Sequence, residues 1–283
     1  MKSPKILFAI LAAIGFALTI YAFGIEPRLL VVREYNIAAR HWDGEPLRIA
    51  MISDTHVGGP HVTAARIGRV VERINALEPD LIVLLGDYEH GHVSYDRSDQ
   101  AFRDEVAAGL AAFGSLEAPC GVVSILGNHD WWYDGDVVRD ELVGAGVTVL
   151  ENASVAASCG GQSFWIAGLA DRITRDPDHN ATMGAIPPGD NILLLSHHPD
   201  EFADLTRDIS LVLAGHSHGG QVVFPLLGRP IVPSDYGQRF AYGHIEEDGR
   251  SMVVTSGIGE SKLPLRFGVP PEIAVVTLSG AED

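Results

Sequence analysis

Residues of the types that bind divalent metal ions gather in five short segments of this chain of 283 residues. Each segment comes directly after an apolar run rich in Val, Ile and Leu. The set combines imidazoles, carboxylates and one side-chain amide, and such ligands suit borderline metals better than Ca²⁺. The candidate ligands are Asp54, His56, Asp87, Asn128, His197, His216 and His218.

Such a set can hold two metal ions close together, with one carboxylate shared between them. Two divalent metals neutralise charge on a phosphoryl group and make a bound water far more acidic, which is the chemistry that hydrolysis of a phosphate ester requires. Each segment alone is weak, since Asp-x-His and Gly-Asp arise often by chance. All five in this order, each after an apolar run, favour a dinuclear metal site over solvated loops.

The apolar runs before these segments predict buried β-strands, because short runs of Val, Ile and Leu are typical of strands covered on both faces. Amphipathic helical patterns lie between them, and this alternation predicts βαβ units with a largely parallel central sheet. Ligands gather at the carboxyl ends of parallel strands, so we expect the five segments to converge. The predicted strands are 47–52, 81–85, 122–126, 192–195 and 211–214, and the helices span 67–77 and 102–113, with shorter ones near Leu142 and after Pro199.

From Gln221 to Leu278 the apolar runs are shorter and are separated by Gly and Pro. This pattern predicts an antiparallel meander that forms most of a second sheet. The expected architecture is two sheets packed face to face with helices outside. The meander strands are predicted at 222–224, 243–245, 252–254 and 273–276, and an edge strand at Leu29–Tyr35.

The first residues are predicted to be a membrane segment. Ile6 to Ile25 is an almost uninterrupted apolar run, and about 20 such residues span a bilayer as a helix. Lys2 and Lys5 precede it, as in a signal peptide or a signal anchor. We expect an uncleaved anchor, with a cleaved signal as the alternative, because no clear cleavage site follows. The predicted divisions are an anchor at 1–25, a linker with the edge strand at 26–46, and one domain at 47–283.

The net charge and the cysteines limit which partners and which cellular compartment the domain can have. The formal net charge of −17 repels polyanions, so no nucleic-acid partner is expected. Lys2 and Lys5 favour a cytoplasmic start, with the following domain outside the cytoplasm, but Arg28, Arg33 and Arg40 lie just beyond the apolar run and leave the opposite orientation open. Cys120 and Cys159 lie near apolar runs and are interpreted as buried free thiols; the alternative, a disulfide, requires an oxidising compartment.

The five segments resemble the pattern of the calcineurin-like metallophosphoesterase superfamily, namely Asp-x-His, Gly-Asp, Gly-Asn-His-Asp, His and Gly-His-x-His. The resemblance extends over roughly residues 47–278, and segments 214–222, 256–259 and 263–272 are similar to a membrane-anchored bacterial branch. It implies a four-layer α/β/β/α sandwich of two mixed sheets. It also implies a phosphoester hydrolase with two divalent metals, Mn, Fe or Zn, with Mg or Ni as alternatives.

The resemblance further implies a role for each residue. A hydroxide bound to the metals would attack the phosphorus, while His129 would stabilise the phosphate and protonate the leaving oxygen, with Asp130 orienting His129. One metal would bind Asp54, His56, Asp87 and His218, and the other Asp87, Asn128, His197 and His216. Separately from the resemblance, Trp131 and Trp132 after the catalytic loop are candidates to line a substrate pocket, to lie at the membrane surface or to pack in the core, and Arg266 is a candidate phosphate contact.

The chain departs from the protein phosphatases of the superfamily, which continue Gly-Asp with Asp-Arg-Gly. Here Gly86-Asp87 is followed by Tyr88 and Glu89, so a protein phosphatase is not expected. His90 and His92 in this loop are interpreted as solvated, with a substrate contact or a third metal as the alternative.

Three hypotheses for the function remain. The first is hydrolysis of a phosphodiester or pyrophosphate bond in a lipid-linked substrate at the bacterial inner membrane. Relatives in the branch are associated with UDP-2,3-diacylglucosamine in lipid A biosynthesis, a cytoplasmic step that conflicts with the outward orientation. The second is a general extracytoplasmic phosphodiesterase acting on nucleotides or wall-polymer fragments. A non-catalytic binding module is least favoured, because no ligand of the pattern is missing.

Overall fold

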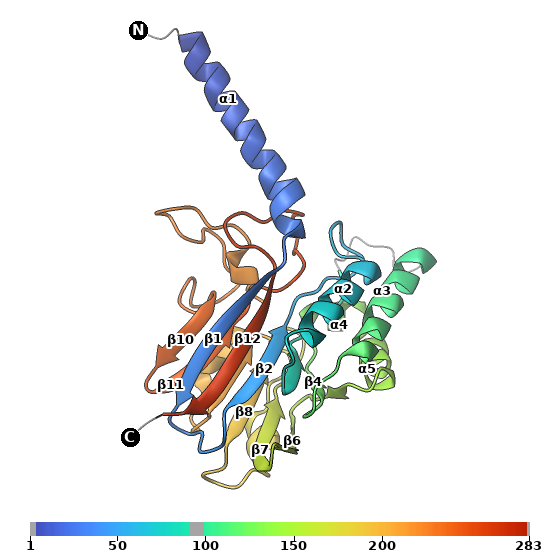
Figure 1. The fold of residues 1–283 in the computed structure, drawn as a ribbon, viewed down its shortest axis with the longest axis vertical. Coiled ribbons are helices and arrows are strands. Elements are labelled where there is room, and N and C mark those ends of the chain that lie inside the picture. Colours follow the sequence, from blue (N-terminus) through green and yellow to red (C-terminus); the bar gives the residue numbers. More distant parts are fainter. Residues whose placement is uncertain (1–3, 91–98, 282–283) are drawn as a thin grey trace.

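The computed structural model describes residues 4–90 and 99–281 of the chain. In this part, two six-stranded sheets pack face to face and helices lie against their outer faces (Figure 1). The layers follow the order helix, sheet, sheet, helix. The predicted four-layer α/β/β/α sandwich is confirmed.

Both sheets are mixed, as expected. The first sheet contains, from edge to edge, β1 (Val31–Ala39), β12 (Glu272–Gly280), β2 (Leu47–Ile52), β3 (Leu81–Leu84), β4 (Val122–Ser124) and β5 (Thr148–Val149). The second contains β10 (Gly243–Glu247), β11 (Arg250–Val254), β9 (Leu211–Ala214), β8 (Ile192–Ser196), β7 (Gln162–Gly168) and β6 (Ala153–Cys159). In the first sheet, β12 and β2 run antiparallel and the other neighbours run parallel. In the second, the four central strands are parallel and both edge strands are antiparallel to their neighbours.

The outer helices bury one apolar face each, as their sequence patterns predict. The helix α2 begins after Thr63, whose side chain accepts a hydrogen bond from the backbone N–H of Arg66, and it turns Ile67, Val70 and Ile74 onto the first sheet. The helix predicted after Pro199 is a short 3₁₀ segment. Covering the first sheet are α2 (Ala64–Asn75), α3 (Gln100–Ala112), α4 (Asn128–Tyr133) and α5 (Gly135–Gly144); against the second lie α6 (His179–Met183) and the 3₁₀ segment Pro199–Asp204.

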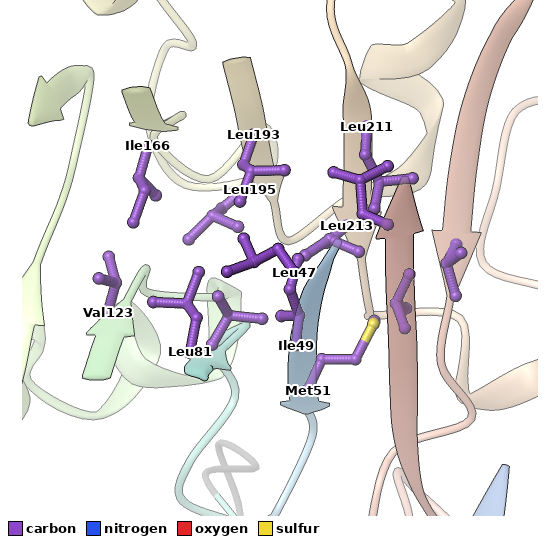
Figure 2. Close-up of a cluster of buried hydrophobic side chains, with 14 of the residues drawn as sticks. Leu47, Ile49, Met51, Leu81, Val123, Ile166, Leu193, Leu195, Leu211 and Leu213 are labelled. Carbon is purple, nitrogen blue, oxygen red and sulfur yellow. The ribbon is translucent and has the colours of Figure 1, made fainter. Parts of the chain in front are cut away.

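The main core lies between the two sheets (Figure 2). Alternate residues of β2, Leu47, Ile49 and Met51, point into it, while Ala50 and Ile52 face the helices on the other side. Burying each large aliphatic side chain contributes about 1.5–3 kcal/mol, so this layer fixes the relative position of the sheets. The edges of the two sheets are therefore held in a fixed position relative to each other.

The predicted antiparallel meander is wrong. Strands β10 and β11 form a hairpin, but β11 pairs in parallel with β9, and β12 lies in the other sheet between β1 and β2. Residues 222–224 form only isolated bridges. Residues 273–276 of β12 are fully buried, which suits the centre of a sheet, and a short apolar run does not specify which strand it will pair with.

The interpretation of the cysteines as free thiols is also wrong. Cys120 and Cys159 form a disulfide, with their Cα atoms 5.4 Å apart. Cys120 lies just before β4 in the first sheet, and Cys159 ends β6 in the second. The bond therefore joins the two sheets covalently at the amino end of β4.

The amino-terminal segment leaves the domain as a projecting helix (Figure 1). Within the described residues, one helix, spanning 4–28, is long and apolar enough to cross a membrane, with a mean hydropathy of 2.5. It consists of α1 (Pro4–Ile20), a π-helical turn (Tyr21–Ile25) and a 3₁₀ turn (Glu26–Arg28). Next comes β1, parallel to β12, which is antiparallel to β2. The carboxyl end of β2 therefore lies at the end of the sandwich from which α1 projects.

Removal of the disulfide should destabilise the domain. The bond closes a loop across a sequence separation of 39 residues, and such a constraint on the unfolded chain is worth about 2–4 kcal/mol. We expect Cys120→Ser with Cys159→Ser to lower the melting temperature measured in detergent by circular dichroism. The same fall should follow when the native chain is reduced. Two thiols that react with an alkylating reagent in unreduced, denatured protein would contradict the bond.

Candidate metal centre

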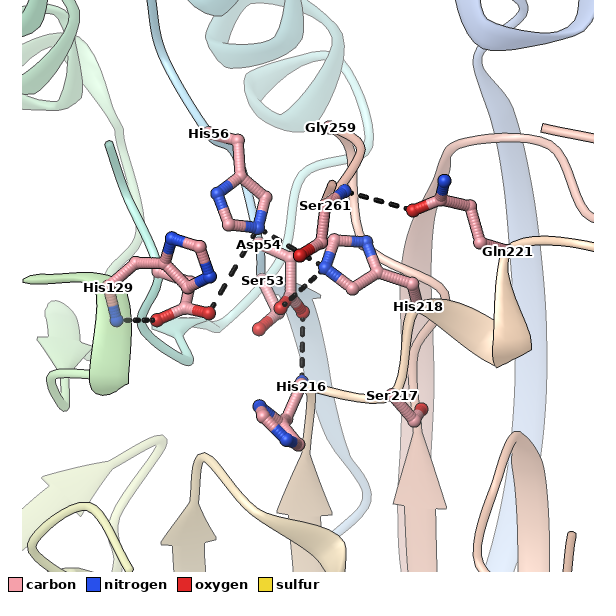
Figure 3. Close-up of polar contacts among 12 residues, drawn as sticks. Ser53, Asp54, His56, His129, His216, Ser217, His218, Gln221, Gly259 and Ser261 are labelled. Carbon is pink, nitrogen blue, oxygen red and sulfur yellow. Dashed lines mark hydrogen bonds and ion pairs between the residues drawn. The ribbon is translucent and has the colours of Figure 1, made fainter. Parts of the chain in front are cut away.

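All five polar segments meet at one edge of the sandwich. The segments after β2, β3 and β4 come from the first sheet, and those after β8 and β9 come from the second. Backbone contacts tie them together: the N–H of Asp54 donates to Gly86 (2.9 Å), and the N–H of Gly215 donates to His197 (3.1 Å). The N–H of His216 crosses between the sheets to a carboxylate oxygen of Asp54 (3.0 Å). Figure 3 shows the resulting cluster.

Many of the candidate ligands have left-handed backbone conformations. Their φ angles are 51° for Asp54, 47° for His56, 57° for Asp87, 63° for His216 and 50° for His218. Asp and His tolerate this region better than most residues, but it is still disfavoured and is typical of functional sites. The sharp turns after three strands direct these side chains toward one another.

One group of ligand atoms consists of Asp54, His56 and His218. The Nε2 atom of His218 lies 3.3 Å from Oδ1 of Asp54 and 3.2 Å from Nε2 of His56. Two ligands that bind one ion at about 2.0–2.1 Å are separated by roughly 3–3.5 Å, so these spacings suit a shared cation. Oδ1 of Asp54 is buried and accepts no hydrogen bond from the described residues. The group therefore fits a metal ion.

A second group consists of Asp87, His197 and His216. The Nε2 atom of His197 lies 3.2 Å from Oδ2 of Asp87 and 3.2 Å from Nδ1 of His216. The same Oδ2 atom is 4.0 Å from Nε2 of His56, so Asp87 lies between the two groups. Asn128 is buried, and its Oδ1 atom has no hydrogen-bond partner among the described residues.

The protonation of the imidazoles follows from burial and from the carboxylates. Burial lowers the pKa of His56, His216 and His218, which keeps these rings neutral and leaves lone pairs available to a metal. Burial also opposes charge on His197, but Asp87 and Asp54 raise its pKa to about 10. The raised pKa of His197 therefore reflects the negative charge of the two carboxylates beside its ring.

Backbone carbonyls orient two of the rings. Nδ1 of His56 lies 3.1 Å from the carbonyl oxygen of Glu89, and Nδ1 of His197 lies 2.6 Å from that of Leu85. Donation from Nδ1 to a carbonyl fixes the ring and turns Nε2 toward the site, as is common behind metal-binding histidines. A Cβ atom at Gly127 would lie 2.3 Å from Oδ1 of Asp87, so only glycine fits beside this carboxylate.

His129 reaches the same space from the start of α4. Its backbone N–H donates to Oδ1 of Asp87 (2.8 Å), and its ring centre is 4.6 Å from that of His56 and 4.8 Å from that of Trp132. Asp130 accepts backbone hydrogen bonds from Gly127, Asp87 and Tyr88 (2.7–2.8 Å). Asp130 therefore joins the loops after β3 and β4.

Other expected site residues lie elsewhere. Arg266 is fully buried and donates to the carbonyl oxygens of Ser256, Gly259 and Val269, so the expectation of a phosphate contact is wrong. The guanidinium of Arg175 lies over the ring of Trp131, 3.4 Å from its centre. His90 is buried rather than solvated, and its ring centre is 5.8 Å from that of His56. His92 lies outside the described residues.

Residues outside the predicted ligand set brace the site. The hydroxyl of Tyr88 donates to the carbonyl oxygen of Ile125 (3.0 Å) and accepts from the N–H of Gly86 (3.2 Å), so it joins the loops after β3 and β4. Gly257 and Gly259 approach Asp54 and Thr55 so closely that a Cβ atom would lie 2.8 and 2.5 Å from their atoms. Only the contact geometry distinguishes such positions from ordinary loop residues.

Comparison with known proteins identifies the family. The calcineurin-like phosphoesterase model matches residues 47–220. The chain is 32% identical over 265 residues to the uncharacterized metallophosphoesterase YkuE of Bacillus subtilis (strain 168), which covers 91% of this chain and 88% of that protein. It is 29% identical over 266 residues to the phosphodiesterase YaeI of Escherichia coli (strain K12), covering 91% and 92%.

Two further comparisons are less extensive. The chain is 31% identical to a transmembrane protein with metallophosphoesterase domain from Danio rerio, covering 83% of this chain and 54% of that protein. A 5'-nucleotidase precursor from Thermus thermophilus superposes with a TM-score of 0.47 at 19% identity, over 75% of this chain and 48% of that one. By its family match, the chain belongs to the calcineurin-like phosphoesterases and is a metal-dependent hydrolase of phosphate esters.

Proposed function

We propose that the chain is a membrane-anchored phosphoesterase with two metal ions that hydrolyses a phosphodiester or pyrophosphate bond in a lipid-linked substrate. The observation that carries this proposal is the position of the candidate centre. The ligands of the first sheet follow β2, β3 and β4, whose carboxyl ends lie at the end of the sandwich from which α1 projects, and the N–H of His216 from the second sheet reaches Asp54 there. With α1 in a membrane, the centre lies on the bilayer side of the domain, where the phosphates of lipid headgroups are concentrated.

We assign the ligands by their spacing. Asp87 is shared, because its Oδ2 atom lies between His56 and His197. Two bound divalent cations, Mn, Fe or Zn by ligand type, would neutralise the phosphoryl oxygens and make a bound water acidic enough to supply the nucleophile. Asp54, His56 and His218 hold one cation, and Asn128, His197 and His216 hold the other.

A ring nitrogen of His129 lies within 4.8 Å of ligand atoms of His56 and Asp87, and we assign His129 to the substrate rather than to a metal. Its backbone N–H is already bonded to Asp87, so its ring is held at the margin of the centre and faces the rings of His56 and Trp132. From there the imidazole can stabilise a phosphoryl oxygen and donate a proton to the leaving oxygen. Asp130 acts as a positioning residue, because its carboxylate holds the turn that begins α4.

The disulfide supports an extracytoplasmic domain. Bonds such as Cys120–Cys159 persist in oxidising compartments and are rare in the cytoplasm. This location favours a lipid-linked phosphate exposed on the outer side of the membrane over the cytoplasmic hydrolysis of UDP-2,3-diacylglucosamine. An extracytoplasmic location is equally compatible with the second candidate, a phosphodiesterase for soluble nucleotides or wall-polymer fragments. The substrate experiment below distinguishes this candidate from the lipid-linked one.

Substitution of the shared carboxylate should remove both metal ions. We expect Asp87→Asn to lose metal, measured by plasma mass spectrometry, and to lose hydrolysis of a chromogenic phosphodiester by more than the roughly 10–100-fold typical of residues behind the ligands. Asp140→Asn, an exposed change of the same chemistry on α5, should match the native chain. An Asp87→Asn protein with full metal content and native turnover would exclude the assignment.

Loss of His129 should separate turnover from metal binding. We expect His129→Ala to retain its metal ions while kcat falls by about 10²–10⁴-fold, the usual contribution of a proton donor. His244→Ala, at an exposed position of β10, serves as the matched control. Loss of metal in His129→Ala with unchanged activity per bound metal would instead make His129 a ligand.

The preferred substrate should be part of a membrane. We expect the full chain in lipid nanodiscs, supplied with Mn²⁺, to hydrolyse a lipid-linked pyrophosphate at a higher kcat/KM than a soluble chromogenic diester. The physical reason is that a substrate held in the bilayer reaches a site on the bilayer side of the domain at a high local concentration. Cleavage of soluble diesters without any cleavage of the lipid substrate would favour the second candidate.

A further inference from the structure

We propose that two loops beside α1 form a membrane-insertion surface, whose apolar side chains enter the headgroup region of an anionic bilayer; the proposal rests on the membrane anchoring in the proposed function. The loops span residues 221–233 and 261–268. Their exposed apolar residues, named here the apolar rim, are Phe224, Leu226, Leu227, Ile231 and Leu263.

The apolar rim is exposed to an extent that is unusual for large aliphatic side chains grouped together. Leu226 is 106% exposed, Leu227 and Ile231 are each 77% exposed, and Leu263 is 60% exposed. A contiguous apolar patch on a soluble surface commonly marks a site of contact with a protein or a membrane. Leu226 also has a φ of 71°, a conformation that a bulky residue rarely adopts. A fully exposed leucine at such a position gains nothing from packing within the domain.

The two loops form one structural unit. The N–H of Phe267 donates to the carbonyl oxygen of Gln221 (3.0 Å), and the N–H of Val223 donates to that of Phe267 (2.7 Å). The side chain of Gln221 donates to the carbonyl oxygen of Leu263 (2.8 Å) and accepts from the N–H of Ser261 (2.9 Å). The tip of the first loop is a tight turn, closed by two hydrogen bonds between the backbones of Phe224 and Gly228 (both 2.9 Å).

This unit is joined directly to the membrane helix, which identifies the bilayer as its partner. The rings of Phe224 and Tyr21 lie 5.8 and 6.3 Å from that of Phe267, so an aromatic row connects the rim to the helix. The N–H of Arg266 donates to the carbonyl oxygen of Ala22 (3.0 Å). The buried carboxylate of Glu26 accepts the N–H groups that follow Phe267, at 2.9 and 2.6 Å. In Figure 1 both loops lie at the base of α1.

The charge of the two loops suits anionic lipids. The chain carries 37 acidic residues, yet none lies in 221–233 or 261–271. These segments carry the basic residues Arg229 and Lys262 instead, and Arg28 is exposed at the foot of the helix. Basic residues at an apolar surface add attraction to the anionic headgroups of a membrane. Gln221 follows His218 by three residues, so insertion of the rim holds the metal centre close to the headgroups.

Fluorescence quenching tests the insertion without reference to catalysis. The full chain with Leu227→Trp is placed in nanodiscs of phosphatidylcholine and phosphatidylglycerol, with or without bromine on the acyl chains. The matched control is Val143→Trp, a 56% exposed position on α5 outside the two loops. After the native chain's emission is subtracted, we expect Leu227→Trp to be blue-shifted and to lose most of its emission to bromine, while Val143→Trp loses none.

Three other outcomes of the quenching experiment overturn the proposal. Absence of quenching at Leu227→Trp would show that the rim stays in water, and equal quenching of the two tryptophans would show that contact with the lipid is not specific to the rim. A blue shift that grows with protein concentration and resists bromine would show that a second copy covers the rim.

Hydrolysis of the soluble chromogenic diester at the native rate shows that Leu227→Trp is folded. Quenching in a chain without any hydrolase activity would overturn the proposed function alone, and activity without quenching would overturn the insertion alone.

Discussion

The carboxylate of Asp87 lies buried between two groups of imidazoles, and a buried carboxylate is stable only if charged or polar partners replace its lost hydration. The backbone N–H of His129 satisfies one of its oxygens, while the other faces His56 and His197. Cations placed in these groups would supply the remaining charge. The turns after β3 and before α4 accommodate this carboxylate. Gly127 leaves space for its Oδ1 atom, and Asp130 accepts hydrogen bonds from both turns.

Left-handed backbone at several ligands costs roughly 1–2 kcal/mol for each residue, which the surrounding fold must offset. The offset comes from the core between the sheets, where β2 alone buries Leu47, Ile49 and Met51. A rigid core also fixes the edges of the two sheets relative to each other. Ligands from both sheets can then converge, because neither sheet can slide without opening this core.

The same edge carries the connection to the helix α1. Glu26 and the backbone of Ala22 hold the foot of this helix against the segment around Arg266. Arg266 in turn donates to Ser256 and Gly259, in the loop that packs on Asp54. The apolar helix and the candidate metal centre are therefore linked through one short series of buried contacts, and the disulfide lies away from it, at the amino end of β4.

The sequence by itself determined the chemistry and the layers. Metal-ligand residues after apolar runs, and amphipathic helices such as α2 between those runs, are local patterns. They can be recognised in the sequence without knowing which segments pack against one another. Tertiary structure decided which strands pair: β12 joined β1 and β2, and the paired strands β6 and β7 went unpredicted. It also decided the pairing of Cys120 with Cys159 and the burial of Arg266. These depend on contacts between distant residues, whose geometry no spacing along the chain encodes.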